Sequence, residues 1–269
     1  MEREMGSTSK RVERVKFLTN LMIQKDQITI SEAMRLLNVS EATVRRLFRE
    51  MEENGIGIRS YGSLRKRSIN LGYSFETESR SYSREKQRIG RLAVSYVTDG
   101  DTIYLDCGTT TFQMTLALSE RIAAGDFRSL NIVTNSIVNV QALGAANNCH
   151  IILVGGEYSN SRRDFSGALA DRFIEALYFD KCFVGCDGVT LQSGFATKDV
   201  SISSLNSCII KRADFVGVLC DSSKFGKSAP ISYAKLNEID CLITDSEPKV
   251  EFAAALEREG IRLVIAEEK

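Results

Sequence analysis

The sequence contains one histidine, and its cysteines do not have the spacing of metal ligands. His150 would have to serve alone in a Ser-His-Asp triad or a zinc site, so both kinds of enzyme are disfavoured. It precedes an apolar run, which predicts a residue at the edge of a strand. The chain has seven cysteines, an odd number that cannot all pair in disulfides within one chain. Cys182 and Cys186 are four positions apart, not the three of a metal-binding pair. This usage favours free thiols in the cytoplasm over a disulfide framework.

Long hydrophobic runs are also missing. No stretch approaches the roughly 20 apolar residues of a membrane span, and residues 1–10 lack the apolar core of a secretory signal. We therefore expect a cytoplasmic protein without a membrane partner, and no metal ion or cofactor. The 269 residues are 43% apolar and 26% charged, which is ordinary for a globular protein with room for two domains.

Charge is balanced over the whole chain but not along it. Residues 1–70 contain 14 Lys and Arg against 9 Asp and Glu, a net charge of +5. The remainder contains 21 against 26, a net charge of −5. A basic head on an acidic body suggests that the head meets a polyanion.

The basic head has the pattern of a DNA-binding fold. Residues 12–22 carry apolar side chains at helical spacing, and residues 28–30 are typical of a brief strand. Ser31 is expected to cap a helix that Asn38 ends, and Ser40 to cap the next one. Two helices joined by so tight a turn indicate a helix-turn-helix.

The second helix, residues 41–53, is expected to enter the major groove with its N-terminal residues at the base edges. Residues 56–67 alternate and contain turn glycines, which predicts a β-hairpin wing. Arginine can bond guanine through two N–H groups, and hydroxyl groups can reach phosphates or bases. The predicted DNA-binding residues are Ser31, Ser40, Ala42, Thr43, Arg45, Arg46, Arg49, Tyr61 and Arg65.

From residue 83 onward, apolar strands alternate with helical patterns. This order predicts a largely parallel sheet with helices on both faces and a ligand at the carboxyl ends of the strands. Residues 70–82 are polar without a strong period and are interpreted as a linker. The predicted helices include 168–177, 200–211 and 250–259, and the predicted strands are 102–105, 130–134, 151–154, 182–185, 215–219, 241–244 and 262–265.

Polar and glycine-rich loops follow five of these strands. The first joins an acid, a glycine and three threonines at a helix N-terminus, where anions bind well. Lys224 can meet a phosphate. Each loop alone could be turn chemistry, and the threonines could merely cap a helix, but five together favour a phosphorylated, polyhydroxylated ligand. The predicted effector-binding residues are Asp106, Gly108, Thr109, Thr110, Thr111, Thr134, Asn135, Gly155, Gly156, Asp187, Gly188 and Lys224.

Both parts resemble the DeoR family of bacterial transcription regulators. The motifs that carry the resemblance lie at 30–33, 36–46 and 53–56 in the head, and at 106–110, 133–136, 155–156, 183–189, 194–199 and 221–226 in the body. The resemblance implies an α+β winged helix-turn-helix domain (1–69), a linker (70–82) and an α/β sensor domain (83–269) similar to ribose-5-phosphate isomerase and the CoA-transferases.

The sequence departs from the family pattern at several positions. Leu47-Phe48 stands where the family usually has Asp-Leu, and Tyr61-Gly62-Ser63 where it usually has His-Gly-Gly. Ser222 stands where histidine is frequent, and Ala196 where a second hydroxyl is frequent. The two changes in the head bear on which operator sequence is bound and on how the wing contacts DNA. The two changes in the body bear on which effector is preferred.

The resemblance implies a repressor of a sugar-metabolism operon. Its partners would be double-stranded operator DNA and a phosphorylated sugar, and it would act as a dimer or tetramer. An alternative is a sugar-phosphate isomerase or acyl transferase with an appended DNA-binding domain, for which Asp106, Asp187 and Lys224 could serve. A third interpretation, an architectural DNA binder, would leave the polar strand-end loops without a role.

Overall fold

The computed structural model describes residues 11–21 except 12, 16 and 20, and residues 27–53, 57–60, 62–66, 73–144 and 148–268. The chain divides into two compact units, Met1–Leu71 and Gly72–Lys269. Each is described separately.

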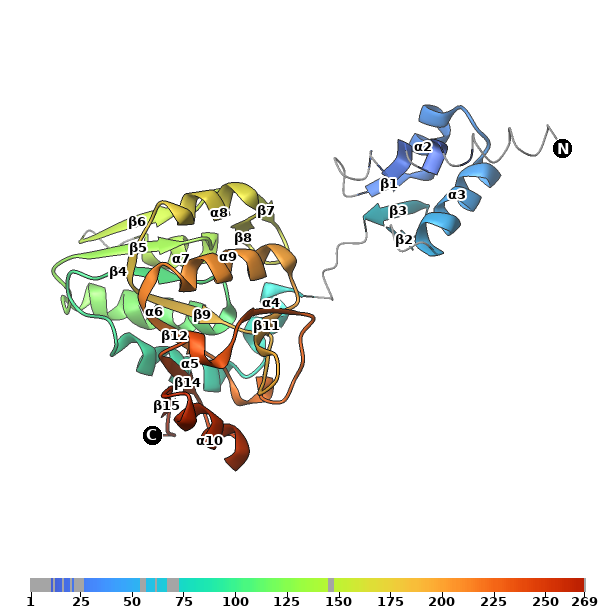
Figure 1. Ribbon diagram of the computed structural model, residues 1–269. Helices are drawn as coiled ribbons and strands as arrows, with labels where there is room; N and C mark the ends of the chain where they lie inside the picture. The colour runs from blue at the N-terminus through green and yellow to red at the C-terminus, as the bar shows by residue number, and fades with distance from the viewer. Residues whose placement is uncertain are drawn as a thin grey trace. The chain divides into compact units, whose positions relative to one another are not determined.

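The first unit is a winged helix-turn-helix (Figure 1). The described residues between 11 and 21 are helical. They precede a three-stranded antiparallel sheet in the order β1-β3-β2, whose β2–β3 hairpin is the predicted wing. Gly62 turns this hairpin with φ at +72°, a conformation that glycine adopts easily. The elements are β1 (Gln27–Thr29), α2 (Ile30–Leu37), α3 (Glu41–Glu53), β2 (Gly57–Ser60) and β3 (Ser63–Lys66).

The turn between α2 and α3 forms as predicted, but a different residue from the predicted one caps α2. Asn38 ends α2 in the left-handed conformation, with φ at 49°. The prediction that Ser31 caps α2 was wrong, because the Thr29 hydroxyl accepts the Glu32 N–H at 3.2 Å and the helix begins at Ile30. The Ser31 hydroxyl lies instead 3.1 Å from that of Thr29.

The second unit is built on a seven-stranded parallel sheet in the order β15-β14-β12-β9-β4-β5-β6 (Figure 1). All seven predicted strands are confirmed within one or a few residues at each end. They are β4 (Thr102–Leu105), β5 (Leu130–Thr134), β6 (Cys149–Leu153), β9 (Phe179–Gly185), β12 (Ala213–Leu219), β14 (Cys241–Thr244) and β15 (Arg262–Ile265). His150 is the second residue of β6, which confirms its predicted place near the edge of a strand.

Helices cover both faces of this sheet, because its buried strands present apolar side chains alternately to each side. Ile103 and Leu105 of β4 belong to one core, and Tyr104 between them belongs to the other. The first core includes α5 (Ser83–Val94), α6 (Thr109–Ala123) and α7 (Ile137–Leu143), and the second includes α8 (Ala168–Glu175), α9 (Val200–Ile210) and α10 (Val250–Arg258).

Several short elements had no clear sequence signal. Residues 70–82, which the sequence assigned to a linker, contain the helix α4 (Phe75–Arg80). Two small antiparallel sheets lie beside the main one. They are formed by β7 (Glu157–Ser159) with β8 (Asp164–Ser166), and by β10 (Gly188–Thr190), β11 (Gly194–Thr197) and β13 (Ile231–Ala234).

All seven cysteines are free thiols. Among the described residues, none of the helices combines the length and apolar character that crossing a membrane requires.

Candidate functional site

Helix α3 has one apolar face and one basic face. Val44, Leu47, Phe48 and Met51 recur at helical spacing and are at most 2% exposed. Ala42, Arg45, Arg46 and Arg49 share the same spacing on the opposite side, and all four are exposed. The helix can therefore pack on its unit and still present arginines to a polyanion.

The remaining predicted DNA contacts lie around this basic face or outside the described side chains. Ser40 directly precedes α3, and its hydroxyl lies 3.1 Å from the Thr43 hydroxyl. Ser31 is exposed on the first turn of α2. Arg65 lies on β3, opposite Ile58 of β2, and Tyr61 falls outside the residues that the structure describes.

In the second unit, an inner cavity of about 40 Å³ opens at the carboxyl ends of β4 and β9. These two strands are neighbours, and the chain order runs in opposite directions on either side of them. Such a switch point is where parallel α/β sheets usually bind ligands. Six of the predicted effector residues line this cavity: Asp106, Gly108, Thr109, Thr110, Asp187 and Lys224.

The N-terminus of α6 faces the inner cavity. Gly108 is the N-cap residue, and no side chain caps the helix. The alternative that the threonines merely cap this helix is therefore wrong. Uncapped N–H groups and the helix dipole together favour an anion at this end.

The two predicted carboxylates are held by the protein itself. Asp106 is 3% exposed and accepts the N–H groups of Cys107 at 2.7 Å and Gly185 at 2.9 Å. Burial raises the pKa of Asp106 above its usual value. One oxygen of Asp187 accepts from the Thr197 hydroxyl at 3.0 Å and the Lys198 N–H at 2.9 Å. The second oxygen of Asp187 accepts no hydrogen bond from the described residues.

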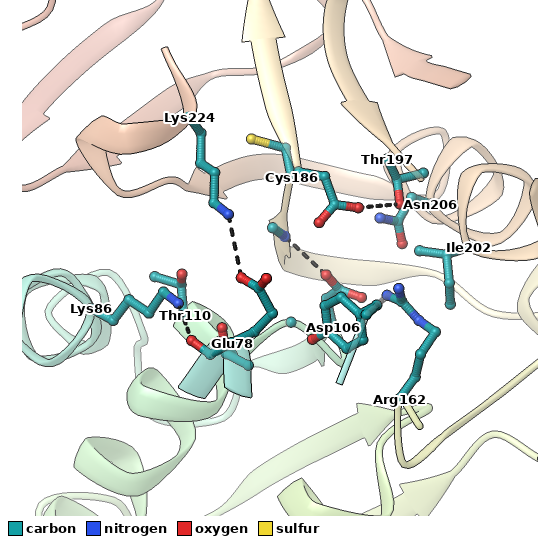
Figure 2. A pocket seen from close by; sticks show the side chains of 15 residues that line it. Glu78, Lys86, Asp106, Thr110, Arg162, Cys186, Thr197, Ile202, Asn206 and Lys224 are labelled. Atoms are coloured by element: carbon teal, nitrogen blue, oxygen red, sulfur yellow. Dashed lines mark hydrogen bonds and ion pairs between the residues drawn. The ribbon is translucent and has the colours of Figure 1, made fainter. Parts of the chain in front are cut away.

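Three cations border the inner cavity: Lys86, Arg162 and Lys224 (Figure 2). Lys86 is 2% exposed, and its burial lowers its pKa. Burial also opposes the charge of Lys224, but the carboxylates of Asp221, Glu78 and Asp187 outweigh it and raise the Lys224 pKa. A bound anion would likewise favour the charged form of Lys86.

The guanidinium of Arg162 is buried with an incomplete set of partners. Arg162 is 6% exposed, and its Nε donates to Asp164 at 2.9 Å. Its Nη2 lies 3.6 Å from the Cys107 sulfur, and Nη1 has no hydrogen-bond partner among the described residues. Asn206 is 1% exposed and lines the same cavity, and neither of its amide atoms has a hydrogen-bond partner in the described part of the chain. A ligand with several oxygens would satisfy these groups.

Sequence reasoning missed several lining residues, two of which had a readable signal. Lys86 recurs with Ile89, Gly90 and Ala93 on the buried face of α5, and Asn206 shares the buried face of α9 with Ile202 and Ile209. A polar side chain on an apolar face indicates a partner inside the protein or in a cavity. Arg162 is not part of such an apolar pattern, so no signal in the sequence indicated it. Tyr73 and Glu78 were missed because residues 70–82 were interpreted as a linker. The other missed lining residues are Gly185, Cys186, Thr197 and Ile202.

Six predicted effector residues do not line the cavity. The amide of Asn135 is engaged by Tyr104 and by the Phe165 carbonyl, and the hydroxyl of Thr134 donates to the Leu105 carbonyl at 2.6 Å. They thus brace the strand ends. The other four are Thr111, Gly155, Gly156 and Gly188.

A larger outer cavity of about 360 Å³ adjoins the inner one. The two share Glu78, Lys86, Asp187 and Lys224. Lys198 and Lys227 add two more cations to the outer wall.

Two family models match the chain. A DeoR-like helix-turn-helix domain matches residues 14–69, and a DeoR C terminal sensor domain matches residues 81–246. One match lies in each unit.

Full-length relatives match as well. The chain is 31% identical to the HTH-type transcriptional repressor GlcR of Bacillus subtilis over 95% of this chain and 96% of the relative. It is 27% identical to the transcriptional regulator IolR of Bacillus subtilis over 87% of this chain and 91% of the relative. Among solved structures, ribose 5-phosphate isomerase A from Methanocaldococcus jannaschii is similar at 18% identity over 54% of this chain and 55% of that chain, with a TM-score of 0.41.

Proposed function

Because the chain belongs to the DeoR family of transcription regulators, we propose that it represses a sugar-metabolism operon under the control of a phosphorylated sugar. The family matches span the DNA-binding and sensor units, and they identify a DNA-binding regulator rather than an enzyme. Regulators of bacterial operons act on DNA in the cytoplasm, which is where we place this protein.

The observation that carries the effector proposal is the inner cavity at the switch point. Lys86, Arg162 and Lys224 border it together with the uncapped N-terminus of α6. Three cations and a helix N-terminus attract a phosphate, and the free oxygen of Asp187 and the amide of Asn206 suit sugar hydroxyls.

On the DNA side, we assign operator contacts to the basic face of α3. Arg46 and Arg49 reach base edges or phosphates in the major groove, and Ser40 and Thr43 contact the backbone near the start of the helix. Ser31, Ala42 and Arg45 border this surface, and Tyr61 and Arg65 of the wing complete the proposed interface.

The proposed control is thermodynamic linkage. Winged helix-turn-helix heads usually bind repeated half-sites as dimers or higher oligomers, so we expect a dimer or tetramer. An effector that binds one arrangement of the sensor units more tightly shifts how two heads are spaced on the operator.

The experiment is a binding titration with phosphorylated sugars, among them ribose 5-phosphate and several hexose phosphates. At least one should bind and raise the melting temperature, because a ligand specific to the native state stabilises it. Lys224→Ala should weaken that binding at least about tenfold by removing one charge contact. Lys211→Ala removes an exposed lysine at the end of α9 and serves as the matched control. Equal affinity in Lys224→Ala and wild type would contradict the proposed site.

A further inference from the structure

Residues 73–80, which contain α4, contact all three cations of the inner cavity. Lys86 Nζ donates to the Glu78 carbonyl oxygen at 2.7 Å, and Lys224 Nζ lies 3.6 Å from the Glu78 carboxylate. The Arg162 guanidinium lies 4.4 Å from the centre of the Tyr73 ring. Figure 2 shows Glu78 with both lysines directed toward it. One short segment therefore contacts the same three cationic side chains that an anionic effector would bind.

The two cavities that Glu78 lines differ in size. The inner cavity of about 40 Å³ has room for water but not for a sugar phosphate. Small-molecule sites usually measure about 300–1,000 Å³, which the outer cavity of about 360 Å³ reaches. Glu78 borders both spaces. Withdrawal of its side chain would join them into one cationic pocket.

A small number of contacts hold this segment in place. Phe75 packs edge-on against Phe112 of α6 with ring centres 5.5 Å apart, and its N–H donates to the Ser161 carbonyl at 2.9 Å. Glu76 forms an ion pair with Arg163. A helix of six residues is too short to be stable alone, so its position depends on these contacts and on the cavity cations.

Building on the proposed function, we propose that residues 73–80 are an internal plug that competes with the effector. The Glu78 carboxylate stands beside Lys224 where the effector phosphate binds, the Glu78 carbonyl occupies Lys86, and the Tyr73 ring covers Arg162. Effector binding displaces the plug. Tyr73 follows Lys66, the last residue of β3, by only seven positions. Displacement therefore acts on the chain that leads directly into the DNA-binding unit.

The first test measures inorganic phosphate binding to the full-length protein by calorimetry at constant ionic strength. Glu78→Gln removes the competing charge but keeps the side-chain shape and the backbone carbonyl that Lys86 contacts. Phosphate should bind about tenfold more tightly to this variant, because no anion has to be expelled. Glu251→Gln, an exposed carboxylate on α10, should bind like wild type. Equal affinity of Glu78→Gln and wild type would overturn the plug.

The second test follows the plug directly. The chain contains no tryptophan, so Tyr73→Trp introduces a single tryptophan, whose emission can be followed and whose ring can still stack on Arg162. Saturating phosphate should shift its emission to longer wavelength as the indole moves into water. Tyr178→Trp, at a position that is 73% exposed, should show no shift. Bound phosphate without a shift at position 73 would mean that the segment stays in place.

Failure of the plug differs from failure of the effector site. If Lys224→Ala loses phosphate binding while Glu78→Gln binds like wild type, the effector site stands and the plug is wrong. If neither wild type nor Glu78→Gln binds phosphate, both proposals are wrong.

Discussion

Two adjacent arginines on α3 differ in how free they are to bind DNA. Arg45 is held by Glu41 one turn earlier, with 2.6 Å between Nη2 and the carboxylate oxygen. Arg46 is exposed and forms no ion pair within the described residues. The unpaired guanidinium can reach a guanine without first breaking a contact, so Arg46 is the stronger candidate for a base contact.

At this scale, we predict that Arg46→Ala weakens operator binding by about 10- to 100-fold, the usual cost of losing a bidentate arginine–base contact. Fluorescence anisotropy at one fixed salt concentration measures the change. The matched control is Arg84→Ala, an exposed arginine on α5, which should bind the operator like wild type. An unaltered operator affinity in Arg46→Ala would remove this residue from the interface, and a simultaneous loss of effector binding would indicate misfolding.

Sequence reasoning located part of the candidate site and overextended the rest. Strand-end loops are polar whether they bind a ligand or brace the sheet, and the sequence does not distinguish the two. Asp187 keeps an oxygen beside the cavity, whereas the equally polar Asn135 is bound by Tyr104 and Phe165. Arg162 reaches the cavity only through tertiary folding of the loop between β7 and β8.

Helices α5 and α6 pack unusually closely at one point. A Cβ atom added at Gly90 would lie 2.5 Å from the backbone carbonyl carbon of Gln113 and from the nitrogen of Met114. Both neighbours are backbone atoms and cannot rotate away. The close contact fixes α5, which carries Lys86, against α6, whose N-terminus faces the inner cavity.

We therefore predict that Gly90→Ala lowers the free energy of unfolding by roughly 2 kcal/mol, because overpacking outweighs the better helix propensity of alanine. Urea unfolding measures it. Gly155→Ala is the matched control: a Cβ there meets nothing within 4 Å, and the change should stay within about 0.5 kcal/mol. If Gly90→Ala is as stable as Gly155→Ala, the helices are not held by this contact.

Elements differ in how well the sequence reveals them. The seven strands of the main sheet read as apolar runs, so all were predicted. The inner strands are largely buried on both faces, whereas the edge strands β6 and β15 are only partly buried. Strands β7 and β8 have three residues each, and α4 contributes only Phe75 to the core. Such short elements are stabilised by tertiary contacts, and local periodicity does not show them.

At the scale of the whole molecule, the chain joins a DNA-binding unit to a sensor unit. Its net charges of opposite sign agree with this division: the basic head contains α3 and the wing, and the acidic body contains the cavities. A regulator works only if ligand binding in one unit changes the affinity of the other, and this coupling must be reciprocal. Regulation therefore depends on a coupling free energy between the two units, which neither unit can show alone.

The most direct test titrates operator DNA with the full-length protein, with and without a saturating phosphorylated sugar that binds it. We predict that the operator Kd changes at least about fivefold, the lower end of typical allosteric coupling, and that Lys224→Ala abolishes the change while retaining operator binding. An operator Kd that stays constant with every phosphorylated sugar that binds the protein would contradict regulation by such an effector.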